Sequence, residues 1–467
     1  MRFSNFCRIY EVCDSKNNFY YLLRYSLLNY SFLFSLKEFE ILLDDLKIGK
    51  NSKEVKELNE KHLIVQDNYK EVKFVDYLIK SRGVNKAYFD IFYLIFDTHC
   101  NLNCKYCYTE GSVQSGFKHQ KMNKLKLEKT FIFLERFILE GLKKKFVNNK
   151  IAFIFYGSEP LMYPDLFKCS LKKIDKLSKK LNFIPEKQII TNGTLITNSI
   201  ADLLKKEEVS VSVSLDGKKE INDQMRIFPN KMGSFDKILE GINKFKNKKV
   251  PFSISCTLGS HNINFLNENL EFFKQIGARG VGFNLPLEAK FKEIPFLSIL
   301  KANKKLFGSF DYATKCNFFE SRVGRKLKAF NDFGKIHFRD CGAYGNQLVF
   351  FPNGDIGICQ GYLGYRKNLV GNINSSTAQE IIESPILRKW SLRSPINRSE
   401  CLNCPALGIC GGGCIFNSEC NYGDILHRNK AFCIHTLMSL DWLINKSIKK
   451  KLNDENVYVQ NMTFLFR

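Results

Sequence analysis

Short apolar runs alternate with longer amphipathic segments through the middle of the chain, between residues 88 and 310. The short runs are rich in Ile, Val and Phe and are bounded by polar residues or Gly, which is typical of buried strands. The longer segments, such as 124–146 and 235–248, repeat apolar residues with the period of a helix. The six runs that predict strands are 89–97, 151–157, 188–192, 209–215, 252–258 and 280–286. Six strand–helix units predict an α/β fold whose parallel sheet forms a partial (β/α)6 TIM-type barrel over residues 86–310.

Residues 1–85 have a different pattern and predict a separate unit. Aromatic-rich segments at 17–25 and 29–35 indicate a small sheet, and three helical segments follow them. Ser35 with Glu38, and Asn51 with Glu54, have the spacing of capping boxes that would open the first two helices. A small sheet with three helices predicts a winged-helix-like domain. The pattern alone is also compatible with a packing extension or a DNA-binding module.

The remaining third of the chain predicts a polar connector at 311–340 and a cysteine-rich domain at 341–440. A helix at 435–452 is expected to close the chain, so that 441–467 comprises the helix end and a polar tail.

Composition changes this picture in two ways. The formal net charge is +24, and the excess is mainly Lys scattered through helices and loops. This distribution indicates a solvated surface more than an anionic partner, so nucleic acid is not expected to bind. The 16 cysteines, without a cleavable signal pattern or an apolar stretch of membrane-spanning length, indicate metal or redox chemistry in a reducing cytoplasm.

The densest candidate site directly follows the first barrel strand. Cys100, Cys104 and Cys107 have the spacing Cys-x3-Cys-x2-Cys on the loop that leaves the strand at its carboxyl end. Three thiolates so close together can hold three corners of an iron–sulfur cube and leave one iron without a protein ligand. A structural zinc site would need a fourth ligand.

With Tyr106 before the last cysteine, this motif resembles the signature of the radical S-adenosylmethionine (SAM) enzymes. The resemblance implies that Cys100, Cys104 and Cys107 are the catalytic cluster ligands. It also implies that SAM binds the open iron and is cleaved to a 5′-deoxyadenosyl radical, with an electron donor such as ferredoxin or flavodoxin.

Motifs after the next three strands support the resemblance. The segment 155–160 resembles the family's Gly-Gly-Glu-Pro motif with Ser158 in place of the second Gly, 191–193 is a tight turn, and 214–217 followed by Arg226 resembles the stretch that binds the ribose and carboxylate of SAM. Asn222 stands where a His is common. The residues that this resemblance assigns to SAM binding are Tyr106, Gly157, Ser158, Glu159, Pro160, Thr191, Asn192, Ser214, Asp216 and Arg226.

The cysteine-rich domain resembles the seven-cysteine SPASM extension, which binds two auxiliary [4Fe–4S] clusters and would bring the total to three. By resemblance, the four ligands of the second auxiliary cluster are Cys401, Cys404, Cys410 and Cys433. The first would receive Cys341, Cys359 and Cys414. Its fourth iron would then be open to a substrate thiolate, unless Cys316 loops back to close it.

The resemblance implies a radical SAM peptide maturase that cross-links a ribosomally made precursor, with a Cys thioether as the favoured bond. The position of residues 1–85 is similar to that of a leader-peptide recognition domain, in which a peptide adds as a strand to a sheet edge. A sulfatase-maturing, formylglycine-forming enzyme and a peptide epimerase are alternatives, as is a regulatory protein that uses clusters only for structure or redox sensing. Sulfatase maturases have an Asp base at the position of Gln360, whose amide cannot take a proton.

Overall fold

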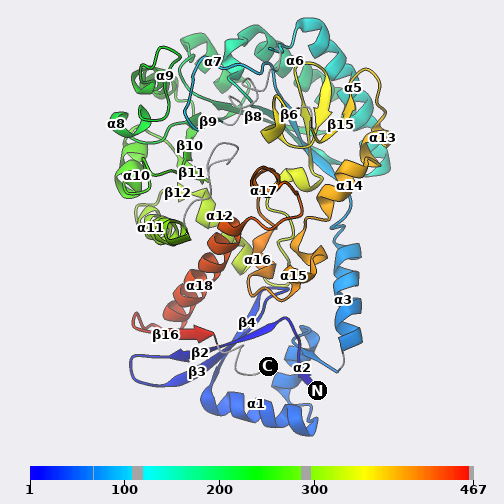
Figure 1. The fold of residues 1–467 in the computed structure, drawn as a ribbon, viewed down its shortest axis with the longest axis vertical. Helices are drawn as coiled ribbons and strands as arrows, with labels where there is room; N and C mark the ends of the chain where they lie inside the picture. The colour runs from blue at the N-terminus through cyan, green and yellow to red at the C-terminus, as the bar shows by residue number, and fades with distance from the viewer. Residues whose placement is uncertain (67, 108–118, 286–295, 366, 462–467) are drawn as a thin grey trace.

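The computed structural model describes all residues except 67, 108–118, 286–295, 366 and 462–467 (Figure 1). Its centre is a sheet with the strand order β12-β11-β10-β9-β8-β7-β6-β13-β14-β15. Neighbouring strands from β6 to β11 are parallel. The six predicted barrel strands are all present, as β6 (Phe89–Leu94), β7 (Val147–Phe155), β8 (Ile184–Thr191), β9 (Ser210–Ser214), β10 (Phe252–Thr257) and β11 (Gly280–Asn284). The predicted α/β fold is therefore confirmed.

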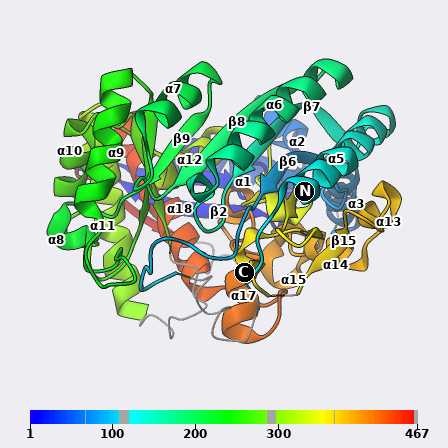
Figure 2. The same ribbon diagram turned by 90° about the horizontal axis from the view of Figure 1, so that it is seen from above.

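Amphipathic helices cover the outer face of this sheet, as Figure 2 shows from above. Their apolar sides meet the strands in a core rich in Phe, in which Phe92 of β6 lies 6.1 Å from Phe137 and 5.7 Å from Phe153 between ring centroids. The connecting helices are α5 (Lys124–Lys144), α6 (Pro164–Leu181), α7 (Asn198–Lys206), α8 (Lys219–Asn222), α9 (Phe235–Lys248), α10 (Leu266–Gln275) and α11 (Phe296–Lys315), with a 3-10 turn η1 at Pro160–Met162.

The sheet continues beyond the barrel on both sides. The region 311–340, predicted as a connector, contains the end of α11, a short strand β12 (Phe319–Glu320) parallel to β11, and helix α12 (Ser321–Asn331). On the other side β13 (Gln347–Phe350) is parallel to β6, followed by the antiparallel strands β14 (Asp355–Gly357) and β15 (Leu369–Asn372). The first strand of the cysteine-rich domain is thus hydrogen-bonded into the barrel sheet.

The rest of the cysteine-rich domain consists of short helices and one long one. Glycine residues end several of them in the left-handed conformation, among them Gly411, at φ +73°, after Cys410. The elements are the turns η2 (Gly342–Tyr344), η3 (Gln360–Tyr362) and η4 (Pro395–Asn397), and the helices α13 (Ala378–Ile382), α14 (Pro385–Ser391), α15 (Ser399–Leu402), α16 (Leu407–Cys410), α17 (Ile415–Tyr422) and α18 (Lys430–Leu452).

The N-terminal unit has the predicted sheet and three helices. Ser35 and Glu38 form the expected capping box at α1, but the second capping box is wrong, because α2 begins after Ser52 and has no side-chain cap bond. The elements are β1 (Arg2–Phe3), β2 (Cys7–Cys13), β3 (Phe19–Tyr25), β4 (Tyr30–Ser35), α1 (Leu36–Ile48), α2 (Lys53–Glu60), β5 (Ile64–Val65) and α3 (Asn68–Ser81).

The predicted polar tail instead contributes a strand to this N-terminal sheet. β16 (Tyr458–Asn461) pairs antiparallel with β2, which gives the order β16-β2-β3-β4. Figure 1 shows β16 beside β2, below the long helix α18. β16 therefore covers the β2 edge, and among the described strands β4 is the other edge of the sheet.

The N-terminal sheet is docked on the cysteine-rich domain. Tyr10, Val12 and Leu22 on one face pack in a common core with Leu443 and Ile444 of α18. Buried Asn29 donates its side-chain N–H groups to the carbonyls of Ala329, Lys335 and Gly408, and the Gly408 N–H donates to the carbonyl of Ser26. In the described part of the chain, no helix is long and apolar enough to cross a membrane.

Candidate functional site

The loop that carries Cys100, Cys104 and Cys107 lies at the carboxyl end of β6, where a barrel places its catalytic groups. The backbone N–H of Asn103 donates to the Ile227 carbonyl at 2.7 Å, and the Lys105 N–H donates to the Met225 carbonyl at 2.9 Å. Burial raises the pKa of Cys100 to about 12, and the charges of Glu159 and the other two thiols add to the shift. The structure thus brings the three predicted cysteines together on a fixed loop.

Tyr106 connects this loop to two charged residues predicted to bind SAM. Its hydroxyl donates to Asp216 Oδ2 at 2.6 Å and accepts from Arg226 Nη1 at 2.5 Å. Asp216 Oδ1 accepts from the Thr257 N–H at 2.9 Å, and the Arg226 charge lowers the pKa of Cys104 against the larger, opposing effect of burial. Three predicted residues therefore form one buried network beside the cysteine loop.

Asn222 hydrogen-bonds to the backbone of this network. Its side-chain oxygen accepts from the Asp216 N–H at 3.3 Å, and its amide nitrogen donates to Ser234 at 3.3 Å. The Asn222 amide is fully buried, and it hydrogen-bonds to the backbone N–H of Asp216. Asn is therefore accommodated at this position without an unpaired polar group in the hydrogen bond to that turn.

Glu159 connects the ends of β7 and β8. Its carboxylate accepts from the Asn192 N–H at 2.6 Å, from the Thr191 hydroxyl at 2.8 Å and from the Leu161 N–H at 3.0 Å. Burial raises its pKa, and these hydrogen bonds oppose the rise. Asn192 in turn directs its amide towards Cys100 Sγ at 3.7 Å, so the two strand ends help to position the first cysteine.

The departure at Ser158 is accommodated locally. Gly157 has φ +111°, and a Cβ there would lie 2.7 Å from Ile95, so this position requires glycine. Ser158 is not among the residues with positive φ, and its hydroxyl donates to the Asp97 carbonyl at 2.6 Å. Pro160 begins the turn η1, and Ser214 ends β9.

Sequence reasoning missed His261, which follows β10. Its side chain is 5% exposed, and its Nε2 lies 3.7 Å from Asp216 Oδ2 and has no hydrogen-bond partner among the described residues. Arg226 Nε is also buried without a partner among them. These unpartnered atoms beside the three thiols fit a polar ligand such as SAM. The signal for His261 was weak, since a lone His in a loop is usually structural.

Seven of the eight cysteines of the C-terminal domain, all except Cys420, fall into the two predicted groups. Burial raises the pKa of Cys404 to about 12, and the charges of Cys410, Cys401 and Cys433 contribute to the rise. In the group predicted for the first auxiliary cluster, burial raises the pKa of Cys341 to about 12, and the charge of Cys414 contributes. The pKa of Cys359 is also raised by burial and then by Cys414 and Cys341. Thiols grouped in this way fit clustered metal ions, which bind them as thiolates.

The group of Cys341, Cys359 and Cys414 lies next to the barrel. The pKa of Tyr93 on β6 is raised by burial of its hydroxyl and, in part, by the charges of Cys341 and Cys359. The Tyr93 and Tyr156 rings are 6.1 Å apart, so Tyr156 packs against the barrel residue that lies near Cys341 and Cys359.

Two further cysteines bear on the fourth ligand position of that group. Cys316 lies at the end of α11, where its carbonyl accepts from Lys274 Nζ at 2.8 Å and its thiol interacts with Tyr312. Cys420 of α17 contributes to the raised pKa of Cys359. The thiol near this group is therefore Cys420, which the sequence had not singled out.

Comparison with known protein families agrees with this geometry. Residues 94–273 match the radical SAM superfamily, and residues 341–405 match the SPASM iron–sulfur cluster-binding domain. The chain thus carries a radical SAM domain in its barrel, followed by a SPASM domain in its cysteine-rich part.

Two curated relatives are similar over most of the chain. The radical SAM cyclopropyl synthase TigE of Paramaledivibacter caminithermalis is 26% identical over 353 residues, which cover 73% of this chain and 71% of TigE. A cysteine-type anaerobic sulfatase-maturating enzyme of Clostridium perfringens is 24% identical over 340 residues, which cover 68% of this chain and 85% of that enzyme.

Solved structures share the fold. Native anSMEcpe with bound AdoMet has a TM-score of 0.63 and 23% identity, and the match covers 77% of this chain and 99% of that one. Streptococcus suis SuiB bound to its precursor peptide SuiA has a TM-score of 0.52 and 16% identity, and it covers 92% of this chain and 99% of that one.

Proposed function

We propose that this radical SAM enzyme is a maturase that cross-links a ribosomally made peptide, with a thioether from a Cys sulfur as the bond formed. One observation carries the proposal. The N-terminal sheet, with β4 as an edge, is docked on a cysteine-rich domain that shares a sheet with the three-thiol site. We further propose the division into 1–85 for recognition, 86–310 for radical generation, 311–340 as connector and 341–440 for two auxiliary clusters.

In this proposal Cys100, Cys104 and Cys107 hold a [4Fe–4S] cluster that, with SAM, supplies a 5′-deoxyadenosyl radical when both are bound. Arg226 is suited to a carboxylate, because its guanidinium is buried beside the thiols and Nε has no partner among the described residues. Glu159 joins the segment after β7, which contains Gly157 and Ser158, to the end of β8.

The C-terminal cysteines would hold the other two clusters. Cys401, Cys404, Cys410 and Cys433 provide a complete set of four thiolates. Cys341, Cys359 and Cys414 provide three, and the first two lie near Tyr93 of the barrel. A peptide Cys thiolate is the soft donor that suits a remaining iron position.

The N-terminal unit would recognise the peptide leader. An edge strand such as β4 presents unpaired N–H and C=O groups, to which an extended peptide can add as a strand. Five of the six β4 residues, all except Phe34, are half-buried. The structure of SuiB with its precursor peptide supports a peptide partner for this architecture.

Gln360 favours cross-linking over formylglycine formation. It directly follows Cys359, and its side-chain oxygen accepts from Gln347 Nε2 at 3.1 Å. An amide held in this way cannot act as the general base that the sulfatase-maturing reading requires.

The test is co-expression with a Cys-containing peptide encoded beside the gene, followed by mass spectrometry. Thioether formation removes one hydrogen from carbon and one from the thiol, so the product should lose a hydrogen pair and resist thiol alkylation. A precursor with that Cys changed to Ala should stay unmodified. An aldehyde-reactive product would instead indicate formylglycine formation, and an unmodified Cys peptide would contradict the proposal.

A further inference from the structure

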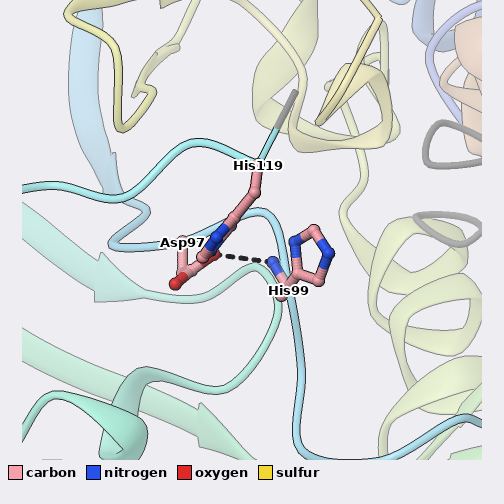
Figure 3. A group of neighbouring side chains, drawn as sticks. All are labelled: Asp97, His99 and His119. Atoms are coloured by element: carbon pink, nitrogen blue, oxygen red, sulfur yellow. Dashed lines mark hydrogen bonds and ion pairs between the residues drawn. The ribbon is translucent and has the colours of Figure 1, made fainter. Parts of the chain in front are cut away.

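Three side chains at the barrel mouth form a group that the radical chemistry does not use. Asp97 follows β6, His99 comes two residues later, and His119 lies across the loop (Figure 3). One ligand atom from each of the three lies within 4.8 Å of the others. Two imidazoles and one carboxylate are a donor set typical of divalent transition metals.

Asp97 is a buried carboxylate without a permanent positive partner among the described residues. Its side chain is 1% exposed, and Oδ1 accepts from the His99 N–H at 2.8 Å and lies 2.6 Å from His119 Nε2. The ion pair formed with His119 requires a protonated imidazole. Burying a carboxylate in this way is costly unless a cation accompanies it, so the site is electrostatically suited to a metal ion.

Surrounding groups hold the carboxylate in place. Asp97 Oδ2 accepts from the Tyr163 hydroxyl, and the Asp97 carbonyl accepts from Ser158 at 2.6 Å. Lys121 lies 4.4 Å from the centroid of the Tyr163 ring, so its charge contacts the ring and not the carboxylate. Such outer hydrogen bonds are those that orient metal ligands.

The two imidazole rings pack edge to face beside this carboxylate. Their ring centroids are 4.2 Å apart at an interplanar angle of 61°, and the His119 side chain is 49% exposed. His99 Nδ1 lies 3.5 Å from the Thr98 hydroxyl. We propose that Asp97, His99 and His119 bind one divalent transition-metal ion, of the Zn²⁺ or Fe²⁺ class, separate from the three iron–sulfur sites. The exposed side of the histidines leaves access for water or a substrate donor.

The rival explanation is a hydrogen-bonded latch without metal. The backbone of residues 97–98 already pairs with that of 120–121. The Thr98 N–H donates to the Gln120 carbonyl at 3.1 Å, and Asp97 and Lys121 form an isolated antiparallel β-bridge. A latch explains the Asp97–His119 contact, but it gives no reason for the His99 imidazole to pack against that of His119.

The experiment uses the full chain with its iron–sulfur clusters reconstituted, so that the cluster thiolates are occupied. Anaerobic equilibrium dialysis against buffered Zn²⁺, with elemental analysis, measures zinc and iron per chain. The wild type should bind one additional zinc, and His119→Ala should weaken that binding roughly tenfold or more. His62→Ala is the matched control, because His62 is an exposed histidine that stacks on Phe74 in the N-terminal unit.

Iron content and cluster absorption in His119→Ala should match the wild type, which shows that the fold and clusters are intact. A zinc-edge anomalous peak between Asp97 and the two histidines would confirm the site. Equal zinc in the wild type and His119→Ala, or no additional zinc in either, would overturn the proposal and leave the latch.

Discussion

The barrel mouth and the N-terminal sheet differ in how their polar groups are used. At the mouth, Asp216 and Arg226 are buried and both hydrogen-bond to the half-buried Tyr106 hydroxyl, so the charged groups have fixed positions. In the N-terminal sheet, β16 covers one edge, whereas β4 has a strand neighbour on one side only among the described residues. The first arrangement suits chemistry on a small, fixed cofactor, and the second suits a partner that is itself a strand. This difference predicts that catalysis and recognition can be disrupted separately.

The largest effect is expected from removing the radical site. Replacing Cys100, Cys104 and Cys107 by Ala should abolish 5′-deoxyadenosine formation and remove about a third of the bound iron, because one of the three proposed four-iron clusters would be lost. Peptide binding, measured by fluorescence anisotropy, should be unchanged. Reductive SAM cleavage by this triple variant would refute the assignment.

A smaller change at the mouth should slow the chemistry without removing the cluster. Tyr106→Phe deletes the hydroxyl between Asp216 and Arg226, which leaves buried charged groups each short of one hydrogen bond, at a cost of about 1–3 kcal/mol. The rate of 5′-deoxyadenosine formation should fall roughly tenfold, at unchanged iron content.

Tyr312→Phe is its control, since that hydroxyl also bonds a carboxylate, Glu271, but on the surface. If both variants cleave SAM at the wild-type rate, the network does not position the cofactor.

The cysteine-rich domain connects the two regions, and its fourth ligand position is tested by two variants. Cys316→Ser and Cys420→Ser should both keep full iron and an unchanged spectrum of the auxiliary clusters, because the cluster proposed for Cys341, Cys359 and Cys414 has an open iron. Iron analysis and electron paramagnetic resonance measure this. A loss of iron in Cys420→Ser would make it the fourth ligand and remove the main support for the thioether.

The smallest effect is expected at the covered edge of the N-terminal sheet. Val459→Pro removes a backbone N–H of β16, opposite Val12 of β2, and should lower the free energy of unfolding by about 1 kcal/mol. SAM cleavage should be unaffected. Thermal unfolding measures the change. A loss of peptide binding in this variant would indicate that the peptide binds at the β2–β16 edge and not at β4.

Much of the barrel could be predicted because its strands are short apolar runs with polar ends. The predicted run 188–192 ends within one residue of β8, and 252–258 within one residue of β10. The cysteine and glycine motifs identified the site because their spacing is local.

The parts that sequence did not reveal depend on distant partners. β16 was expected to be a polar tail, since only β2, far away along the chain, makes it a strand. His119 and His261 are single residues whose relevance comes from Asp97 and Asp216 across the fold. Cys420 likewise gains meaning only from its closeness to Cys359.

Hydrogen–deuterium exchange of the full, cluster-loaded enzyme with its precursor peptide tests the central claim most directly. The account predicts slower exchange of β4 amides (Tyr30–Ser35) on peptide binding, and no change at β16 (Tyr458–Asn461). The triple cysteine variant should show the same protection, because recognition does not need the radical site. Tight binding of the precursor without protection at β4 would contradict the account.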